Sequence, residues 1–436
     1  MKITFLGAGS TVFAKNVLGD CIINPRLGAF DIALFDIDEE RLDDSYQMLN
    51  NINHTMHGRA TIKKYTNRLE ALRGAKYVIN AVQIGGYEPS TVIDFEIPRK
   101  YGLKQTIGDT LGIGGIFRAL RTIPVMEDFA RDMEQVCPDA LFLNYVNPMA
   151  ILTGYMLRYT KIKTVGLCHS VQLCVPKLLK AYKMEEYLGK TKWEIAGINH
   201  MAWLLKIEDL NGNDLYPEIK RRNLVNKGEY PDSHDLVRME IMRRFNYYVT
   251  ESSEHNAEYL PYFIKKNYPE LITKFNIPLD EYPRRCVKQI NDWKEMRDSF
   301  VNIKELTHER SHEYASSIIE ACETDVPFRI HGNVLNHHLI TNLPLNACVE
   351  VPIMIDRNGL NPCIVGDLPE QLAALNRTNI NVQLLTMEAA HTLSKDKIYQ
   401  AAYLDPHTSS ELSLDEIKAL CDDLIEAHGN WLPKYH

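Results

Sequence analysis

Residues 3–10, Ile3-Thr-Phe-Leu-Gly-Ala-Gly-Ser10, contain the pattern that decides the fold of the first half of the chain. The apolar run at residues 3–6 is typical of a short strand that is buried on both faces of a parallel sheet. Gly7, Gly9 and Ser10 follow it and precede a helical pattern. Glycine at such a turn lets the backbone approach a pyrophosphate, which the helix N-terminus attracts. The stretch therefore predicts the first turn of a dinucleotide-binding fold.

Further strand patterns alternate with helical patterns through the first half of the chain. We expect strands at residues 31–36, 61–65, 77–82, 141–146 and 164–167, and a polar amphipathic helix at about 39–56. This alternation indicates a parallel sheet with right-handed crossovers. We predict an α/β fold in which residues 1–190 form a Rossmann-like NAD-binding domain.

Asp36 lies at the carboxyl end of the second predicted strand, where an acid binds the adenosine ribose hydroxyls. This acid favours NAD over NADP, because a carboxylate repels a 2′-phosphate. Asp38 is an alternative for the same role, and Val12 stands where a third glycine is usual. We expect Gly7, Gly9, Ser10 and Asp36 to contact the cofactor, together with Gln83 beyond the fourth predicted strand.

The pattern changes after residue 190. Residues 193–198 and 203–207 alternate like antiparallel strands, and 211–213 form a turn signal. The remainder is mainly helical, and Ser413 with Glu416 forms a capping box that opens a helix. We predict that residues 191–436 form an α+β domain for substrate binding and oligomerisation.

Composition excludes several classes of protein. The chain has 436 residues, 45% of them hydrophobic, and a net charge of 49 − 57 = −8, which argues against a broad electrostatic grip on nucleic acid. No stretch approaches the roughly 18 apolar residues of a membrane span. Nine scattered cysteines are a poor disulfide framework and are typical of a reducing compartment. We expect a cytoplasmic enzyme that contacts neither nucleic acid nor membrane.

Three polar segments follow predicted parallel strands, at the edge where such sheets bind ligands. They are Gln83-Ile-Gly-Gly-Tyr-Glu-Pro89, Asn144-Tyr-Val-Asn-Pro-Met149 and Cys168-His-Ser170. Cys168 and His200, 32 residues apart, offer a thiolate and an imidazole, which bind transition metals. A buried cysteine and a hydrogen-bonded histidine are the alternative interpretation of this pair.

In these segments the sequence resembles the family 4 glycoside hydrolases, and within them the melibiase-type α-galactosidases. Further matching blocks are Gly112-Ile-Gly-Gly-Ile-Phe-Arg-Ala-Leu-Arg-Thr-Ile-Pro124, Gly197-Ile-Asn-His200, Glu251-Ser-Ser-Glu-His255, Glu258-Tyr259 and Asp405-Pro-His-Thr408. The blocks keep their order over nearly the whole chain.

The resemblance implies an unusual hydrolysis, because this family does not use the common pair of carboxylates. Hydride leaves C3 of the sugar for NAD, and the resulting ketone acidifies the proton on C2. A base removes that proton, the leaving group on C1 is eliminated, water adds, and the hydride returns. The resemblance also implies a two-domain arrangement like that of malate and lactate dehydrogenases, and a homodimer or homotetramer.

The resemblance assigns Cys168 and His200 as ligands of a divalent metal, by analogy Mn²⁺. The metal acts as a Lewis acid on the C2 and C3 oxygens of the sugar. A cysteine can bind it only as a reduced thiolate.

The base that removes the C2 proton corresponds to Tyr259, with His255 and Glu258 as alternatives. The acid that protonates the leaving group is His169 or Asp109, since some relatives have an aspartate at the position of His169.

Substrate contacts are expected from Asn147, His169, and Arg284 or Arg285. Phospho-sugar branches of the family normally have asparagine or aspartate after the metal cysteine, so His169 argues for an unphosphorylated sugar, an α-galactoside.

Three other functions compete with this hypothesis. An α-glucuronidase or α-glucosidase of the same family is the nearest. A conventional NAD-dependent 2-hydroxy acid dehydrogenase shares the two-domain plan, but that class has no metal-binding cysteine. A protein that binds NAD without performing chemistry is the third.

Overall fold

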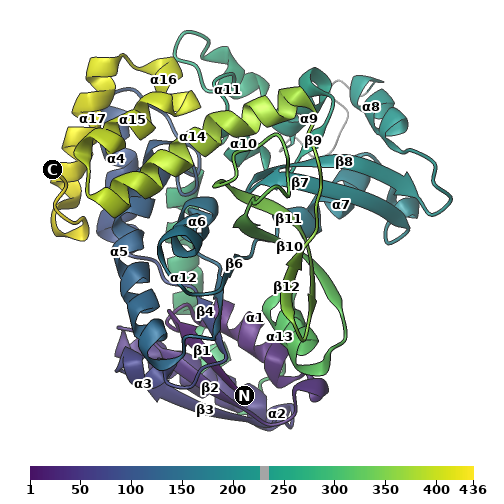
Figure 1. The fold of residues 1–436 in the computed structure, drawn as a ribbon, viewed down its shortest axis with the longest axis vertical. Coiled ribbons are helices and arrows are strands. Elements are labelled where there is room, and N and C mark those ends of the chain that lie inside the picture. The colour runs from purple at the N-terminus through teal and green to yellow at the C-terminus, as the bar shows by residue number, and fades with distance from the viewer. Residues whose placement is uncertain (226–234) are drawn as a thin grey trace.

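The computed structural model describes residues 1–225 and 235–436, whose strands join into one twelve-stranded sheet. Its order is β3-β2-β1-β4-β5-β6-β10-β11-β7-β8-β9, with β12 paired to β11. The strands are β1 (Lys2–Leu6), β2 (Phe30–Phe35), β3 (Ala60–Tyr65), β4 (Tyr77–Asn80), β5 (Leu141–Asn144), β6 (Thr164–Gly166), β7 (Thr191–Ile198), β8 (Met201–Asp209), β9 (Tyr248–Val249), β10 (Phe328–Leu335), β11 (Cys348–Asp356) and β12 (Gly359–Pro362). Figure 1 shows this sheet rising from β2 and β3 at the bottom to β7 and β8 at the upper right.

Helices cover both faces of the sheet. They are α1 (Thr11–Ile22), α2 (Glu39–Thr55), α3 (Arg68–Leu72), α4 (Val92–Lys100), α5 (Gly112–Val136), α6 (Met149–Tyr159), α7 (Ser170–Ala181), α8 (Tyr216–Val225), α9 (Leu236–Phe245), α10 (Ser253–Tyr259), α11 (Glu270–Lys274), α12 (Glu281–Val301), α13 (Ala315–Thr324), α14 (Glu370–Thr392), α15 (Lys395–Leu404), α16 (Pro406–Glu411) and α17 (Leu414–His428). Among these described helices, none has the length and apolar character that a membrane crossing requires.

The first six strands are parallel and form the predicted Rossmann-like sheet, in the order 3-2-1-4-5-6. The predicted strand positions are confirmed, although β4 and β5 end two residues earlier than the apolar runs suggest. Val82 and Val146 lie beyond the strand ends and line a cavity. This explains why each apolar run continues past the end of its strand.

The predicted antiparallel pair is confirmed as β7 and β8, which are joined by the two-residue turn Asn199-His200. This pair belongs to the same sheet as the first six strands, because β10 from the second half pairs antiparallel with β6. Asn333 of β10 lies opposite Gly166, Glu350 of β11 lies opposite Asn333, and Gly197 of β7 lies opposite Glu350. The sheet is thus continuous across the middle of the chain.

The hydrophobic core is shared between the two halves of the sequence. One cluster joins α1 and α2 to α13, and another joins α5 and α6 to α14, α15 and α17. Figure 1 shows α14 crossing above α6, with the C-terminal helices beside α4 and α5. β7 begins at Thr191 within this continuous sheet, and the domain boundary expected between residues 190 and 191 stays a prediction.

The last long helix, α17, begins as its capping box predicts. The Ser413 side chain accepts a hydrogen bond from the backbone N–H of Glu416, whose carboxylate accepts one from the backbone N–H of Ser413. The buried apolar face of α17 packs against the N-terminal half and consists of Ile417, Leu420, Cys421 and Leu424.

A buried ion pair links the helices α4, α5 and α17. The Asp94 carboxylate on α4 accepts hydrogen bonds from both terminal nitrogens of Arg121 on α5, at 2.6 and 3.1 Å. His428 at the end of α17 lies 2.9 Å from the same carboxylate. Arg121 also donates to the carbonyl of Ile84 and so fixes the loop after β4.

We predict that Asp94→Asn lowers the free energy of unfolding by about 3 kcal/mol, because it leaves the Arg121 charge buried without its counter-ion. Urea denaturation followed by circular dichroism measures this change. Glu96→Gln is the matched control: Glu96 lies on the same helix, is exposed, and pairs with Arg99 at the surface, so its loss is worth at most about 0.5 kcal/mol. Equal stability of the two variants would contradict the prediction.

Candidate active site: a cavity with a nucleotide edge and a metal cluster

A cavity of about 570 Å³ lies where the carboxyl ends of β4, β5 and β6 meet the β7–β8 turn and the start of α10. Eight of the residues singled out from the sequence line it: Ser10, Gln83, Asp109, Asn147, Cys168, His169, His200 and His255. The expected ligand-binding crevice therefore lies at the carboxyl ends of the parallel strands.

Ser10, which ends the glycine turn, lines one edge of this cavity, termed the nucleotide edge. A Cβ on Gly7, whose φ is 88°, would lie 2.8 Å from the backbone of Ala81, so no larger residue fits there. The Asp36 carboxylate accepts a hydrogen bond of 2.6 Å from the backbone N–H of Gly9. Asp38 instead caps the N-terminus of α2, where it accepts from the backbone N–H of Arg41. Asp36 is thus the acid that borders the turn.

The surroundings of this turn fit a dinucleotide. The first N–H groups of α1 receive no side-chain cap from Ser10, which leaves them to an anion such as a pyrophosphate. Ile37, next to Asp36, is 93% exposed, and Val12 at the start of α1 is 43% exposed. An adenine ring at this place would cover apolar surface that otherwise contacts water.

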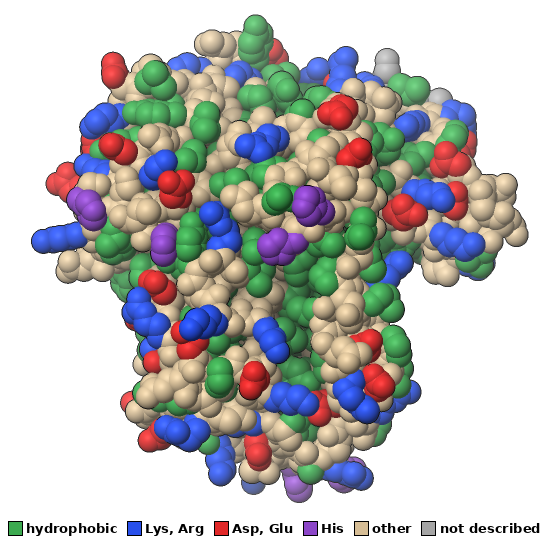
Figure 2. Space-filling view, viewed as in Figure 1, with side chains coloured by type: hydrophobic (Ala, Val, Ile, Leu, Met, Phe, Trp, Pro, Cys, Tyr) green, Lys and Arg blue, Asp and Glu red, His purple; other side chains and the backbone are tan. Residues whose placement is uncertain are grey.

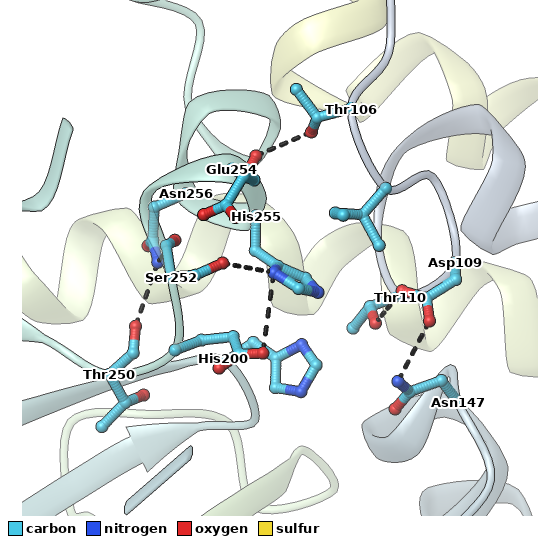
Figure 3. A network of polar contacts seen from close by, with 12 residues as sticks. Thr106, Asp109, Thr110, Asn147, His200, Thr250, Ser252, Glu254, His255 and Asn256 are labelled. Carbon is cyan, nitrogen blue, oxygen red and sulfur yellow. Dashed lines mark hydrogen bonds and ion pairs between the residues drawn. The ribbon is translucent and has the colours of Figure 1, made fainter. Parts of the chain in front are cut away.

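Three potential metal ligands meet on the opposite wall of the cavity. Donor atoms of His200, Glu251 and His255 all lie within 4.8 Å of one another. His200 comes from the β7–β8 turn, Glu251 from the segment after β9, and His255 from the first turns of α10. In Figure 3, the rings of His200 and His255 lie next to each other and face Asp109 and Asn147 across a gap.

The backbone is unusual at two of these three residues. His200 has a φ of 62° and Glu251 a φ of 69°, in the left-handed region that non-glycine residues seldom adopt. Such conformations cost about 1–3 kcal/mol each and cluster at functional sites. The surrounding structure holds both residues in these conformations, which direct their side chains toward His255.

Charge in the cluster suits a cation. Burial acts to raise the pKa of Glu251, but the imidazoles of His255 and His200 and the cations beyond them lower it to about 2. Burial lowers the pKa of His255 and so favours the neutral imidazole that a metal needs. His255 Nδ1 lies 2.7 Å from the Ser252 hydroxyl, which orients the ring.

Cys168 borders the same cluster from the end of β6. Burial acts to raise the pKa of the Cys168 thiol, but the His200 imidazole beside it lowers that pKa below the usual value. In return, the sulfur raises the pKa of His200 to about 10, against the effect of burial. The contact with His200 therefore favours the thiolate of Cys168, the form that binds metals. Sulfur, imidazole and carboxylate donors together fit a divalent transition metal.

Asp109 and Asn147, which both line the cavity, are hydrogen-bonded to each other. The Asn147 amide donates to Asp109 at 3.3 Å, and the Thr110 hydroxyl donates to the other carboxylate oxygen at 2.7 Å. The loop that carries Asp109 is anchored by Glu258, whose carboxylate accepts from the backbone N–H groups of residues 106–108. Burial raises the pKa of Glu258 to about 7 despite these hydrogen bonds.

Tyr259 and His169 contact the site differently. Tyr259 is fully buried, and its hydroxyl lies 3.1 Å from Nδ1 of His200, so it reaches the cluster from behind. Burial raises the pKa of Tyr259 well above its usual value, so a phenolate there depends on a cation nearby. His169 lines the cavity, and its Nε2 lies 2.9 Å from Glu313. This hydrogen bond raises the pKa of His169.

The two arginines expected to contact substrate lie apart from the cavity wall. Arg284 is largely exposed and pairs with Glu281, and Arg285 pairs with Glu281 and Glu254. Arg118 lines the cavity instead; it donates to the carbonyl of Asn147 at 3.1 Å and to the Tyr282 hydroxyl at 2.9 Å.

Sequence reasoning did not single out Glu251 or Arg118 as site residues, and it considered His255 only as a base. Glu251 and His255 stand four residues apart in a segment already noted as Glu251-Ser-Ser-Glu-His255. Two potential ligands at this spacing were a usable signal, since they can face the same way at a helix start. For Arg118, nothing in the local pattern distinguishes a cavity residue from a buried helical one.

Known proteins match this chain over its whole length. It is 63% identical over 434 residues to an α-galactosidase of Bacillus subtilis (strain 168), covering 100% of this chain and 99% of the relative. It is 35% identical over 451 residues to an α-galactosidase of Rhizobium meliloti (strain 1021), covering 100% of this chain and 89% of the relative.

Solved structures share the fold. A putative glucosidase from Bacillus subtilis matches with a TM-score of 0.86 and 24% identity, over 97% of this chain and 99% of that one. The 6-phospho-β-glucosidase from Thermotoga maritima, solved with manganese, NAD⁺ and glucose-6-phosphate, matches with a TM-score of 0.79 and 20% identity over 100% of both chains. Malate dehydrogenase from Plasmodium falciparum matches with a TM-score of 0.55 and 15% identity, over 91% of this chain and 99% of that one, and so confirms the expected dehydrogenase-like arrangement.

Two family models cover most of the chain. Residues 2–184 match the model of the family 4 glycosyl hydrolases, and residues 195–408 match that of the family 4 glycosyl hydrolase C-terminal domain. With the extensive identity to curated relatives, these matches establish that the chain belongs to family 4 of the glycosyl hydrolases.

Proposed function

We propose that this protein hydrolyses α-galactosides with the help of NAD and a divalent metal, by analogy Mn²⁺. The observation that carries the proposal is the pairing of two sites in one cavity. A nucleotide edge with Ser10 and Gln83 faces a cluster of metal-binding side chains around His200. The 63% identity to an α-galactosidase supports the choice of sugar.

When bound, NAD supplies a reversible acceptor for hydride, and the metal supplies a Lewis acid for sugar oxygens. On this proposal, Gly7, Gly9, Ser10, Asp36 and Gln83 hold the dinucleotide. A dehydrogenase of the malate or lactate type has no metal-binding cysteine, so Cys168 beside the cluster favours the hydrolase.

The metal is assigned to Cys168 and His200, as expected from the sequence, and to Glu251 and His255 in addition. All four side chains border one wall of the cavity. Two imidazoles, one carboxylate and one thiolate form a donor set suited to a divalent metal that keeps positions open for sugar oxygens.

Proton transfer is assigned to residues on either side of the metal cluster. Tyr259, whose hydroxyl contacts His200, removes the proton from C2. His169, held by Glu313, donates a proton to the leaving group, and Asp109 is the alternative acid. Tyr259 is fully buried and lies behind His200 rather than in the cavity lining, so this role requires its hydroxyl to reach the cavity beside His200.

Substrate hydroxyls are assigned to Asn147 and His169, with Arg118 in place of Arg284 or Arg285. Arg118 lines the cavity, whereas both other guanidinium groups are engaged by carboxylates outside it. Arg118 also fixes Asn147 through the carbonyl of that residue.

The proposed setting is the cytoplasm, because all nine cysteines are free and the proposed metal ligand must stay reduced. Figure 2 shows lysine and arginine interspersed with acidic side chains on the face in view, rather than a patch of one sign. We expect a homodimer or homotetramer, which light scattering after gel filtration measures.

The first prediction from the proposed function concerns the sugar. With NAD, Mn²⁺ and a thiol reductant, the protein should cleave an aryl α-galactoside at least about tenfold faster, in kcat/KM, than the matching α-glucoside or α-glucuronide, the scale of one net hydrogen bond. Release of the aryl group is followed by absorbance. If the glucoside or glucuronide is cleaved as fast, the assigned sugar is wrong. Net accumulation of NADH with a 2-hydroxy acid would point to a dehydrogenase instead.

The second prediction concerns the metal. Cys168→Ser and Glu251→Gln should each weaken Mn²⁺ binding by about tenfold or more, because each removes a donor from a buried site. Electron paramagnetic resonance of free Mn²⁺ during titration measures the affinity without any turnover. Cys363→Ser is the matched control, since Cys363 lies outside the cavity near the end of β12. Unchanged affinity in both cavity variants would refute the ligand assignment.

The third prediction concerns the base. Tyr259→Phe should lower kcat by about 100-fold or more, the usual contribution of general base catalysis, and leave Mn²⁺ affinity within about twofold. In heavy water, the galactose released by the wild-type enzyme should carry deuterium at C2, as nuclear magnetic resonance detects. Tyr262→Phe, at a tyrosine that is 49% exposed, is the control. Product without deuterium at C2 would exclude proton removal at that carbon.

A further inference from the structure

His169, the acid proposed for the leaving group, contacts a carboxylate from a distant part of the chain. Its Nε2 lies 2.9 Å from Glu313, which is only 9% exposed and lines the same cavity. Glu313 belongs to residues 302–314, an irregular segment that connects α12 to α13. Irregular segments are more mobile than helices and strands, so other contacts must fix the place of Glu313.

Asp20, near the end of α1, anchors this segment. Its carboxylate accepts hydrogen bonds from the backbone N–H and from the hydroxyl of Ser311, at 2.8 and 2.6 Å. Nε2 of His308 lies 2.7 Å from the same carboxylate. The side chains of Asp20 and His308 are almost fully buried. Hydrogen bonds to a carboxylate are stronger than those between neutral groups, and burial strengthens them further.

The surface of α1 is shaped to receive the His308 ring. A Cβ on Gly19 would lie 2.8 Å from three atoms of this ring, so only glycine lets the ring pack so close to the helix. The segment is therefore in close contact with α1, and its position relative to that helix is fixed.

From this anchor the contacts continue to Glu313. The Ser311 hydroxyl, which donates to Asp20, accepts a hydrogen bond of 3.1 Å from the backbone N–H of Glu313. Two residues later, the backbone N–H of Ala315 donates to the hydroxyl of Tyr145 at 3.1 Å, and Tyr145 lines the cavity. The backbone is therefore held on both sides of Glu313.

Ser311, His308 and Asp20 do not form a nucleophilic triad. In such a triad the serine hydroxyl donates to the histidine, and the carboxylate orients the histidine from its other side. Here the Ser311 hydroxyl donates to Asp20, and the His308 ring contacts the same carboxylate. This arrangement holds a segment of backbone in place and does not activate the hydroxyl.

We propose that Asp20 is a positioning residue for protonation of the leaving group. It acts through Ser311 and Glu313, which hold the His169 imidazole beside the glycosidic oxygen. This role rests on the proposed function, in which His169 donates the proton. A misplacement of about 1 Å at a catalytic group can lower the rate about 100-fold, so an anchor on another helix can affect the reaction without touching the substrate.

The experiment compares two galactosides whose leaving groups differ in their need for a proton. Methanol is a very weak acid, so its departure from methyl α-galactoside requires protonation of the glycosidic oxygen. 4-Nitrophenol is a much stronger acid, and 4-nitrophenolate leaves 4-nitrophenyl α-galactoside without a proton. A misplaced acid therefore slows the first reaction selectively, whereas partial unfolding slows both equally.

Two variants weaken the anchor at different points. Asp20→Asn keeps the size of the side chain but replaces one accepting oxygen with a donor. Ser311→Ala removes the hydroxyl that joins Asp20 to the backbone of Glu313. Each should lower kcat/KM for methyl α-galactoside by about tenfold or more, and that for 4-nitrophenyl α-galactoside by less than about threefold.

Glu320→Gln is the matched control. Glu320 on α13 accepts hydrogen bonds from the side chains of Asn24 and Arg26, just after α1, at 2.7 and 2.8 Å. It thus joins the same two regions of the fold but lies outside residues 302–314. This variant should keep kcat/KM within about twofold for both substrates.

Equal losses on both substrates would mean that Asp20 only stabilises the fold, and would overturn the proposal. Unchanged cleavage of methyl α-galactoside by both anchor variants would overturn it too, as would the same selective loss in Glu320→Gln. If the wild-type enzyme cleaves neither galactoside, the proposed function fails and the positioning role fails with it. That result differs from every outcome in which wild-type activity is present.

Discussion

A single row of residues across four strands is the constraint on which the site depends. Gly166, Asn333, Glu350 and Gly197 lie side by side on β6, β10, β11 and β7. A Cβ at Gly166 would come within 2.5 Å of the Thr153 hydroxyl and 2.9 Å of Cβ of Asn333, so the close approach of β6 and β10 requires glycine. Cys168 follows Gly166 by two residues and His200 follows Gly197 by three, so this row sets the distance between thiolate and imidazole.

The rigid row explains how the site keeps two strained residues in position. His200 and Glu251 occupy left-handed backbone conformations, which persist only where the surrounding structure holds them. His200 is held by the two strands of its hairpin, and Glu251 lies between β9 and α10. The cluster is therefore shaped before any ligand arrives, which lowers the entropic cost of binding a cation.

Local patterns were sufficient to predict the nucleotide half, because each parallel strand and its following helix are neighbours in sequence. Gly7, Gly9 and Asp36 could be interpreted together since they belong to one strand–helix–strand unit. The pairing of β10 with β6 could not be predicted, because 167 residues separate Gly166 from Asn333 and no periodicity records a partner that far away. The sharing of the core between α5 and α14 escaped prediction for the same reason.

The sequence points to a site residue where the chemical role requires a residue type that has few other uses. Cys168 and His200 stand out because few side chains bind transition metals. An arginine, by contrast, has many structural uses. Arg284 and Arg285 form ion pairs with carboxylates near the surface, whereas Arg118, near the start of α5, reaches the cavity. Only the three-dimensional arrangement separates these cases, because each arginine lies in an ordinary helical pattern.

The same arrangement singles out one cysteine chemically. Burial raises the pKa of the thiol in seven of the other cysteines: Cys21, Cys137, Cys174, Cys286, Cys322, Cys348 and Cys421. For Cys168 the neighbouring imidazole outweighs burial and lowers the pKa. Because oxidants attack thiolates in preference to thiols, the contact with His200 makes Cys168 the most oxidation-prone of these cysteines.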